Sequence, residues 1–370
     1  MLDVQIEPVT EVTPPPGAAL LSDAESYVRR FTIMPSDAAY VASVLWGAAT
    51  HAHLAFGTFP RLAYLSSEPA SGKTRAQNTL APLCRNPREE LDPTGPVLAA
   101  MISTNHPTIF LDEVDTIFGT RGSNGAHRQL RGILNAGYKA GNVMTRLSRS
   151  ELVSVPVFGP VCFAGLGNLP DTLMSRSIVV RMRQRRPEDV CETFSPRQHQ
   201  PLGAMLGASI GAWVATVMGE ISTSWPDLPA GVADRAEECW TPLLAVADAA
   251  QGEWPERARA AAVALTLGHA DEDVPSPADR LLGDLRMVWP LAGTEPARNA
   301  PTSVLLAALA DLPASPWPAM WAPESAAREL AQLLASRGIS PRKIRPPAGS
   351  PCQGYRWADI AGVAGEDDES

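Results

Sequence analysis

The chain has 370 residues, of which 45% are hydrophobic, so it is long enough for two or three domains and too apolar for wholesale disorder. It contains no run of about 18 uninterrupted apolar residues, and its first residues, MLDVQIEPVTEV, lack the basic and apolar regions of a signal segment. The five cysteines include no CxxC pair, which argues against a disulfide-stabilised fold. We therefore expect a cytoplasmic protein without a membrane span.

The net charge of −9 excludes a uniformly basic nucleic-acid-binding protein, but the charge is unevenly distributed. Residues 121–186 contain eleven basic and two acidic residues, and residues 324–358 contain six basic and two acidic residues. Residues 187–286, in contrast, contain six basic and sixteen acidic residues. The two basic segments are candidate contacts for a polyanion, and a solvated charged surface is the alternative.

The alternation of short apolar runs with helix-forming stretches predicts an α/β fold with a parallel sheet. Candidate strands lie at residues 62–66, near Glu90-Leu91, and at 108–112, 161–166 and 177–182. The longer runs lack polar alternation, as expected for strands that are covered on both faces.

Composition along the chain predicts several regions. A flexible leader containing PPPG is predicted over residues 1–20 and the α/β core over residues 21–186. An acidic helical domain follows over residues 187–290, and a linker rich in Pro, Gly and Ala over residues 290–301. A small domain over residues 300–362 and an acidic tail over residues 363–370 complete the chain.

The sharpest motif follows the first candidate strand. LAYLS leads into SEPASGKT and then into RAQNTLAPLC, which is the order strand, loop, GKT and helix that a P-loop requires. The loop residues are Ser67, Glu68, Pro69, Ala70, Ser71, Gly72, Lys73 and Thr74.

The loop residues suit a bound nucleoside triphosphate. In a P-loop, backbone N–H groups face the phosphates, the Lys73 ammonium would reach the β- and γ-phosphates, and the Thr74 hydroxyl would ligate Mg²⁺. Arg75, the residue after Thr74, is a further candidate nucleotide-binding residue. Ser67 departs from the general pattern, which has glycine at this position. The alternative is a helix start that contains GKT by chance.

A second motif, TIFLDEVD, ends the strand at residues 108–112 with two carboxylates. Asp112, 38 residues after Thr74, is positioned to hold the water shell of Mg²⁺. Glu113 is positioned to polarise an attacking water as a general base. The adjacent Asp-Glu pair favours hydrolysis over transfer to a bound acceptor, and Asp115 is interpreted as a helix-start residue.

Two further candidates follow later strands. Asn168 comes just after VCFAGL and is a candidate γ-phosphate sensor, with a plain turn residue as the alternative. Arg176 precedes the last strand in LPDTLMSRS. In a ring of ATPase subunits, an arginine at this place can enter the neighbouring site and stabilise transition-state charge. A local salt bridge or a helix cap is the alternative for Arg176.

The order of these motifs resembles that of the AAA+ ATPases. The chain is more similar still to an uncharacterised P-loop ATPase domain family of actinobacterial phages, plasmids and integrated elements, whose members are often fused to or encoded beside a primase. The similar segments include RFTIMPSDAAYVASVLWGAATHAH, PRLAYLSSEPASGKTR, HPTIFLDEVDTIF, QLRGILNAGYKAG, LPDTLMSRSIVVRMRQR, DRAEECWTPLLAVADAAQGEWPERAR, LAQLLASRGISPRKIR and GYRWADI.

The resemblance implies a fold and an activity. The fold would be an AAA+-like P-loop NTPase core with a helical lid and a C-terminal winged-helix-like domain. The activity would be Mg²⁺-dependent ATP hydrolysis by a homo-oligomeric, hexameric ring that moves or opens DNA in replication of a phage or mobile element, with a primase as a partner. Serine at position 67 is usual in this family. Arg235 would be a second arginine sensor, and a salt bridge with Glu237 or Glu238 is the alternative.

Two basic regions are candidates for binding DNA. Similar ring helicases place a hairpin or loop before the sensor strand in a central pore, and here Lys139 and Arg146 would make salt-sensitive, sequence-independent contacts with single-stranded DNA. In the C-terminal domain, Arg342 and Lys343 would meet phosphates as in winged-helix proteins. Exposed, solvated side chains are the alternative for the first pair. A winged helix that binds protein gives the second hypothesis, a nucleotide-regulated scaffold or protein-remodelling ATPase.

Overall fold

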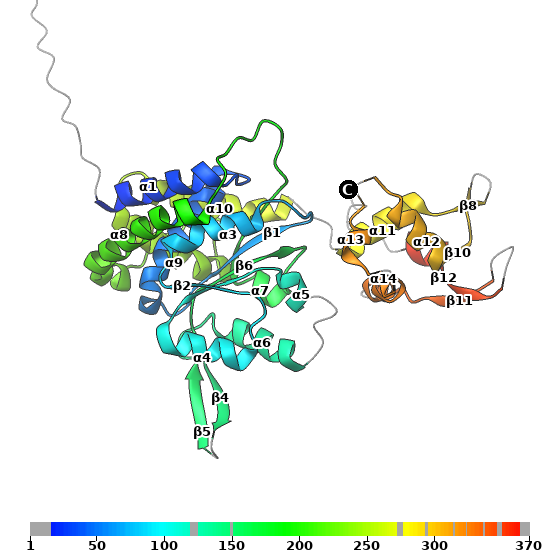
Figure 1. Cartoon of the computed structure of the whole chain (residues 1–370), viewed down its shortest axis with the longest axis horizontal. Coiled ribbons are helices and arrows are strands. Elements are labelled where there is room, and N and C mark those ends of the chain that lie inside the picture. Colours follow the sequence, from blue (N-terminus) through cyan, green and yellow to red (C-terminus); the bar gives the residue numbers. More distant parts are fainter. Residues whose placement is uncertain are drawn as a thin grey trace, which may run out of the picture. The chain divides into compact units, whose positions relative to one another are not determined.

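The computed structural model describes residues 16–118, 125–148, 151–271, 277–292, 295–313, 315–322, 324–335, 337–345 and 350–362. The chain divides into two compact units, Met1–Glu272 and Asp273–Ser370 (Figure 1). The first unit is built around a parallel sheet, and the second is a smaller unit of helices and short antiparallel strands.

A five-stranded parallel sheet lies at the centre of the first unit, which confirms the predicted α/β class. Its strands are β1 (Arg61–Ser66), β2 (Pro87–Glu90), β3 (Thr108–Leu111), β6 (Val161–Leu166) and β7 (Ser177–Arg181). Their order is β2-β3-β6-β1-β7, and every neighbouring pair is parallel. Because all five strands run in one direction, the residues that follow β1, β3 and β6 meet at one edge of the sheet.

Helices cover both faces of this sheet. Along β1, Leu62 and Tyr64 pack into one core, and Ala63 and Leu65 pack into the other. The first face carries α1 (Pro16–Phe31), α2 (Asp37–Ala49), α3 (Lys73–Leu80), α8 (Pro196–Thr223), α9 (Arg235–Ala250) and α10 (Trp254–Asp271). The second face carries α4 (Gly95–Asn105), α5 (Val114–Phe118), α6 (Gly125–Ala136) and the short α7 (Asp171–Met174). Figure 1 shows the sheet between these two layers.

The structure revises the predicted leader over residues 1–20. Residues 1–15 lie outside the described residues, and α1 begins at Pro16. Leu21, Val28 and Phe31 are each 0% exposed and follow helical spacing, so burial of this apolar face holds the segment as a helix. Proline is favoured in the first turn of a helix because its missing N–H has no partner there in any case.

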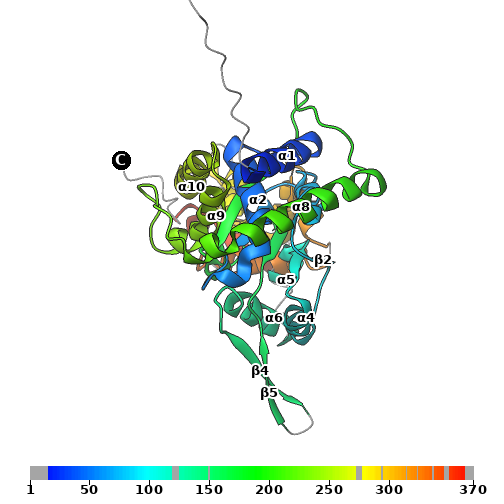
Figure 2. The ribbon, with the colours of Figure 1, turned by 90° about the vertical axis from the view of Figure 1, so that its left-hand side faces the viewer.

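A two-stranded antiparallel hairpin separates β3 from β6 in the chain. It consists of β4 (Val143–Ser148) and β5 (Glu151–Pro156), with Thr145 opposite Ser154. Figure 2 shows the hairpin extending away from the helices and the sheet. Leu152 is 77% exposed, whereas Val155 is 6% exposed. The hairpin is therefore covered near its base and open to solvent further out.

Helix α8 is the longest described helix, and by length and composition alone it could cross a membrane. Its most apolar window has a mean hydropathy of 1.5 and is 28% buried. A packed helix of a soluble protein meets the same criterion. Here Gly203 and Gly207 let α8 approach other segments closely, since a Cβ on Gly203 would lie 2.6 Å from Tyr27 Oη.

The second unit contains several short helices and a three-stranded antiparallel sheet. The helices are α11 (Pro277–Val288), α12 (Thr302–Ala310), α13 (Trp317–Met320), α14 (Ala326–Ala335) and α15 (Trp357–Ala361). The sheet has the order β10 (Asn299–Pro301), β12 (Cys352–Arg356), β11 (Arg342–Ile344). A separate pair is formed by β8 (Leu291–Ala292) and β9 (Glu295–Pro296).

The division between the units differs from the one expected near residue 290. Leu281, Leu282 and Leu285 of α11 are buried in the core of the second unit, together with Trp317 and Tyr355. Residues 299–301, which were expected to belong to a linker, form β10 beside β12. Helical spacing shows that α11 has an apolar face but does not identify the core that this face joins. The acidic tail predicted over residues 363–370 lies outside the described residues.

Candidate functional site

A polar loop connects β1 to α3 at the carboxyl edge of the sheet. Ser67, Glu68, Pro69 and Ala70 are exposed, and α3 begins at Lys73. Gly72, the residue before α3, has φ +85°, a left-handed conformation that glycine adopts without a Cβ penalty. A Cβ at this position would lie 3.7 Å from Met182, so conformation rather than space favours glycine.

Oxygen atoms of the loop surround the Lys73 ammonium. Its Nζ donates to Ser66 Oγ at 2.6 Å, to Ser71 Oγ at 3.1 Å and to the Glu68 carbonyl at 3.2 Å. Burial lowers the pKa of Lys73, and the carboxylates of Asp115 and Asp112 act in the opposite direction. The loop thus holds a cation at the centre of this sheet edge.

Thr74 and Asp112 meet although they follow different strands. The Thr74 hydroxyl donates a hydrogen bond of 2.7 Å to Asp112 Oδ2. Thr74 lies in the first turn of α3 after β1, and Asp112 follows β3, with β6 between these strands in the sheet. A hydroxyl and a carboxylate oxygen at this separation are ligands that suit Mg²⁺, which binds oxygen donors and retains several waters.

Glu113 occupies a strained turn beside Asp112. Its φ of +52° is uncommon for a residue other than glycine. Its backbone N–H donates to Asp112 Oδ1 at 2.8 Å, and its carbonyl accepts from the Thr116 N–H at 2.9 Å. The Glu113 side chain is exposed, so this turn presents a carboxylate to solvent next to Asp112.

The end of β6 is tied to both neighbouring strands. Asp115 Oδ1 accepts from the Leu166 N–H at 3.0 Å, and the Gly167 N–H donates to the Ser66 carbonyl at 2.8 Å. Asn168 is the next residue and is exposed. The structure therefore brings Lys73, Asp112 and Asn168 to one edge of the sheet.

Sequence reasoning missed several residues that support this edge. Gln77 Nε2 donates to the Leu111 carbonyl at 3.2 Å and to the Cys162 carbonyl at 3.3 Å, which ties α3 to β3 and β6. Gln184 Nε2 donates to the Pro69 carbonyl at 3.1 Å. Ser66, beside the predicted motif, could have been included from its position. The contact of Gln184 depends on β7 lying beside β1, which no local pattern reveals.

Arg75 faces an aromatic ring. Its guanidinium carbon lies 5.9 Å from the centroid of Phe194, at cation–π distance. In the described part of the chain, Arg75 Nη1 is also buried without a hydrogen-bond partner.

Arg176 and Arg235 both lie against Tyr138. Their guanidinium carbons are 5.8 Å and 6.0 Å from the ring centroid. Arg235 also forms an ion pair of 2.5 Å with Glu238, which was the alternative considered for it. Tyr138 donates a hydrogen bond of 3.0 Å to the same Glu238 carboxylate.

These two arginines are remote from the polar loop of their own chain. The Arg176 carbonyl accepts from the Arg61 N–H at 2.9 Å, at the amino end of β1. Ser66 ends β1 five residues later, about 16 Å away at roughly 3.3 Å per residue. Arg176 therefore lies at the edge of the sheet opposite Lys73.

The candidate DNA-binding residues are dispersed. Lys139 is exposed at the foot of the hairpin, where it forms an isolated bridge with Thr58. Arg146 lies in β4 opposite Val153, and the placement of its side chain is outside the described part of the structure.

In the second unit, Arg342 and Lys343 are consecutive residues of β11, so their side chains point to opposite faces of the sheet. Arg342 Nε lies 3.5 Å from Asp359 Oδ2. These two residues consequently do not form one basic face, and the charge of Arg342 is partly compensated.

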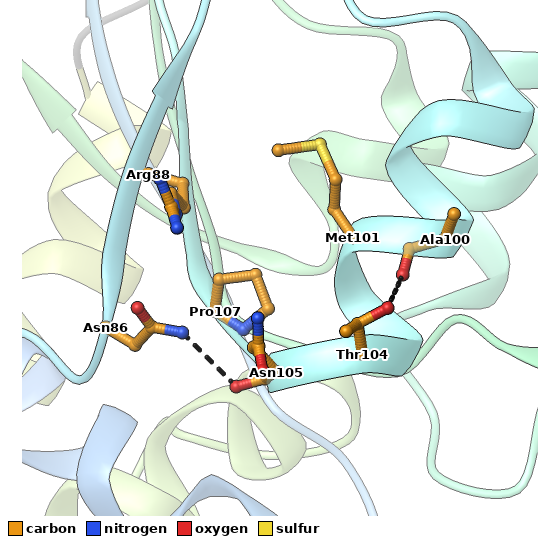
Figure 3. Close-up of a pocket in the computed structure, with 7 residues that line it drawn as sticks. All are labelled: Asn86, Arg88, Ala100, Met101, Thr104, Asn105 and Pro107. Atoms are coloured by element: carbon orange, nitrogen blue, oxygen red, sulfur yellow. Dashed lines mark hydrogen bonds between the residues drawn. The ribbon is translucent and has the colours of Figure 1, made fainter.

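A cavity of about 290 Å³ lies between β2 and α4 (Figure 3). Its lining residues are Asn86, Arg88, Ala100, Met101, Thr104, Asn105 and Pro107. Asn86 Nδ2 donates to the Asn105 carbonyl at 3.3 Å, which joins the segment before β2 to the end of α4. The lining contains none of the residues singled out from the sequence and no carboxylate, so this cavity lacks a general base.

The fold and these contacts define a mixed α/β protein with a five-stranded parallel sheet and polar loops gathered at one edge. A family model described as "Protein of unknown function (DUF3631)" matches residues 181–363, from the end of β7 through the second unit. An "Uncharacterized 28.9 kDa protein in xis 5'region" of Saccharopolyspora erythraea is 36% identical over 177 residues. The alignment covers 48% of this chain and 65% of that protein, so it spans just under two thirds of the relative.

Proposed function

We propose that the chain is a Mg²⁺-dependent ATPase with an AAA+-like P-loop core. The hydrogen bond of 2.7 Å between Thr74 and Asp112 is the observation that carries this proposal, because it joins the two halves of the motif expected for nucleotide hydrolysis. Lys73, surrounded by loop oxygens, and the backbone of residues 67–72 would hold the phosphates. Mg²⁺ bound by Thr74 and Asp112 would neutralise charge on the β- and γ-phosphate oxygens.

The remaining residues of the edge suit hydrolysis. Glu113, exposed beside Asp112, would accept a proton from the water that attacks the γ-phosphorus while the bond to the β-phosphate oxygen breaks. Asn168, which follows the strand between β1 and β3, would orient the γ-phosphate or the water. The strand order supports this assignment because it brings three separate loops to one edge.

We also propose that Arg176 and Arg235 act on the nucleotide of a neighbouring copy. Their separation from Lys73 along β1 supports a role between subunits rather than within one chain. Both lie against the Tyr138 ring, and to enter the neighbouring site they would have to leave their partners in their own chain, the Thr172 carbonyl for Arg176 and Glu238 for Arg235. Such an arrangement needs a head-to-tail interface between identical subunits; we propose that this interface closes into a ring, and six is the number of subunits that we expect.

DNA is the substrate on which we propose that this ATPase acts. The extended β4–β5 hairpin, with Lys139 at its foot, supports contact with a single strand. The second unit, with helices and a three-stranded antiparallel sheet, suits a winged-helix-like module. Because the side chains of Arg342 and Lys343 point to opposite faces of this sheet, at most one of them would contact a phosphate. The name of the relative, which refers to an xis 5' region, supports a role in a mobile element. We propose that the chain acts there in replication and that a primase is its partner. A reducing cytoplasm remains the location that we propose, because the sequence has five cysteines and no CxxC pair.

Steady-state ATP hydrolysis with and without single-stranded DNA tests the proposal, with Lys73→Ala as the blank. The matched control is Arg88→Ala, which removes an exposed basic side chain of β2. Hydrolysis stimulated by DNA supports the translocase. A hydrolysis rate that is the same with and without DNA favours a protein-remodelling ATPase. Mg²⁺-ATP turnover by the wild-type chain that is no greater than that of Lys73→Ala rejects the ATPase function.

A further inference from the structure

Arg61 is a fully enclosed arginine at the first position of β1. Its side chain is 1% exposed and belongs to the largest fully buried side chains of the described residues, which are otherwise aromatic or aliphatic. Burial lowers its pKa to about 9, and the neighbouring charge of Arg176 acts in the same direction. A buried guanidinium is costly to desolvate, so its hydrogen bonds have to offset that cost.

The guanidinium binds backbone carbonyls at both feet of the hairpin. Its Nη2 donates to the Leu134 carbonyl at 2.8 Å, and its Nη1 donates to the Gly159 carbonyl. Leu134 lies near the end of α6, ahead of β4, and Gly159 follows β5. One side chain of β1 therefore joins the segment that enters the hairpin to the segment that leaves it.

Backbone pairing reinforces this junction. The Phe59 N–H donates to the Tyr138 carbonyl at 3.0 Å, and the Ala140 N–H donates to the Gly57 carbonyl at 2.9 Å. Gly137 lies between the two hairpin feet, and a Cβ there would collide with the Val157 carbonyl. The segment before β1 is thus tightly bound to the base of the hairpin.

The same residue contacts the other functional elements. The Arg61 N–H donates to the Arg176 carbonyl at 2.9 Å. From Arg61 the chain runs along β1 to Ser66, whose hydroxyl accepts from Lys73 at 2.6 Å. The hairpin base, the Arg176 backbone and the strand that leads to Lys73 therefore meet at Arg61.

We propose that Arg61 is a positioning residue that couples the β4–β5 hairpin to β1 and to Arg176. This proposal rests on the ATPase function and deepens it. With both carbonyls held by one planar guanidinium, a displacement of the hairpin moves β1 and the backbone at Arg176 instead of being absorbed at the hairpin base. Lysine cannot replace this fork, because a single ammonium on a flexible stem does not span two fixed carbonyls.

The test compares Arg61→Lys with Tyr64→Phe. Tyr64→Phe removes a different buried hydrogen bond from the same strand, that of 2.8 Å to Ser43 of α2, and leaves the hydrogen bonds of Arg61 to the hairpin feet in place. Arg61→Lys is the variant that carries the test. Arg61→Met, which removes the charge while keeping an apolar stem, is measured beside it where that variant folds. Each variant is measured for thermal stability, for basal ATP hydrolysis and for the ratio of hydrolysis with and without single-stranded DNA.

We expect Arg61→Lys to keep basal turnover within about threefold of wild type but to lose most of the DNA stimulation. Tyr64→Phe keeps the stimulation ratio even when its stability is equally reduced. A purely structural role for Arg61 predicts the same ratio in both variants, and that result overturns the proposal.

Hydrogen exchange of the full chain separates this proposal from the ATPase function. Amide exchange at residues 137–142 and 155–159 becomes faster in Arg61→Lys and stays at the wild-type rate in Tyr64→Phe if Arg61 clamps the hairpin feet. Equal exchange in the two variants overturns the clamp. Absence of ATP turnover in the wild-type chain rejects the ATPase function instead, and the exchange result still decides the role of Arg61 at the hairpin.

Discussion

The Thr74 hydroxyl donates a hydrogen bond of 2.7 Å to the Asp112 carboxylate, although the two residues are 38 positions apart and follow strands that are not neighbours. The contact forms because β6 lies between β1 and β3 in the sheet. It therefore depends on the order of the strands as well as on the chemistry of the two side chains. Under the proposed ATPase function, a metal-bound phosphate would lie near this contact, between the loop of Lys73 and the turn of Glu113.

Replacing Lys73 with alanine is expected to weaken ATP binding by about 10- to 100-fold, because charge-assisted hydrogen bonds contribute about 1.5–3 kcal/mol. Binding of a fluorescent ATP analogue measures the effect. The control is Arg88→Ala, which removes an exposed basic side chain of β2, a strand separated from β1 by β3 and β6. Unchanged affinity in Lys73→Ala would contradict the assignment of the loop.

Thr74→Val preserves side-chain shape but removes the hydroxyl that contacts Asp112. We expect hydrolysis to require more Mg²⁺ and to fall by about tenfold or more at fixed Mg²⁺, whereas Thr74→Ser stays close to wild type. Titration of ATP turnover with Mg²⁺ for the two variants provides the measurement. Equal Mg²⁺ dependence in Val and Ser variants would exclude Thr74 as a ligand.

Glu113→Gln is expected to retain nucleotide binding and to lower turnover by roughly 10²- to 10⁴-fold, the usual contribution of a general base. The amide keeps the size of the side chain but cannot accept the proton. Binding and single-turnover hydrolysis are measured on the same preparation. Turnover that persists at the wild-type rate would show that another residue is the base.

Arg176→Ala is expected to lower turnover by roughly 10³-fold while ATP binding remains, as for other arginines that stabilise phosphoryl transfer in trans. The decisive measurement mixes Arg176→Ala subunits with Lys73→Ala subunits. Where an intact Lys73 meets an intact Arg176 across an interface, activity returns. A mixture as inactive as its components would indicate that Arg176 does not serve a neighbour.

Stability is expected to fall in mild acid because of His53. Burial lowers the pKa of this histidine to about 4 in the folded chain, against about 6.5 when unfolded. Below pH 6.5 the unfolded chain takes up the proton and the folded chain does not, so the free energy of unfolding decreases until about pH 4. Thermal unfolding across this range becomes less pH-dependent in His53→Leu. Identical slopes for the two proteins would assign the acid sensitivity to other groups.

Local sequence patterns were sufficient for much of the first unit. Apolar runs such as TIFL and VCFAGL are long enough to be strands and lack polar alternation, so they predicted strands covered on both faces. The loop ending in GKT and the DEVD segment could be singled out from the sequence because the residues on which each prediction rests are adjacent in the chain. The leader was misjudged at Pro16–Leu20, since proline and glycine in sequence do not distinguish a loop from the first turn of a helix.

The amino-acid sequence by itself determined the parallel α/β class, the five strands and the residue types available at their ends, because these depend on periodicity and on neighbours in the chain. Only the tertiary structure decided the order of the strands, the Thr74–Asp112 contact and the core that α11 joins. It also decided that Arg176 and Arg235 share the Tyr138 ring and that Arg61 holds both feet of the hairpin. Each of these relationships joins residues far apart in the chain, and their proximity arises from the packing of strands and helices rather than from any local preference.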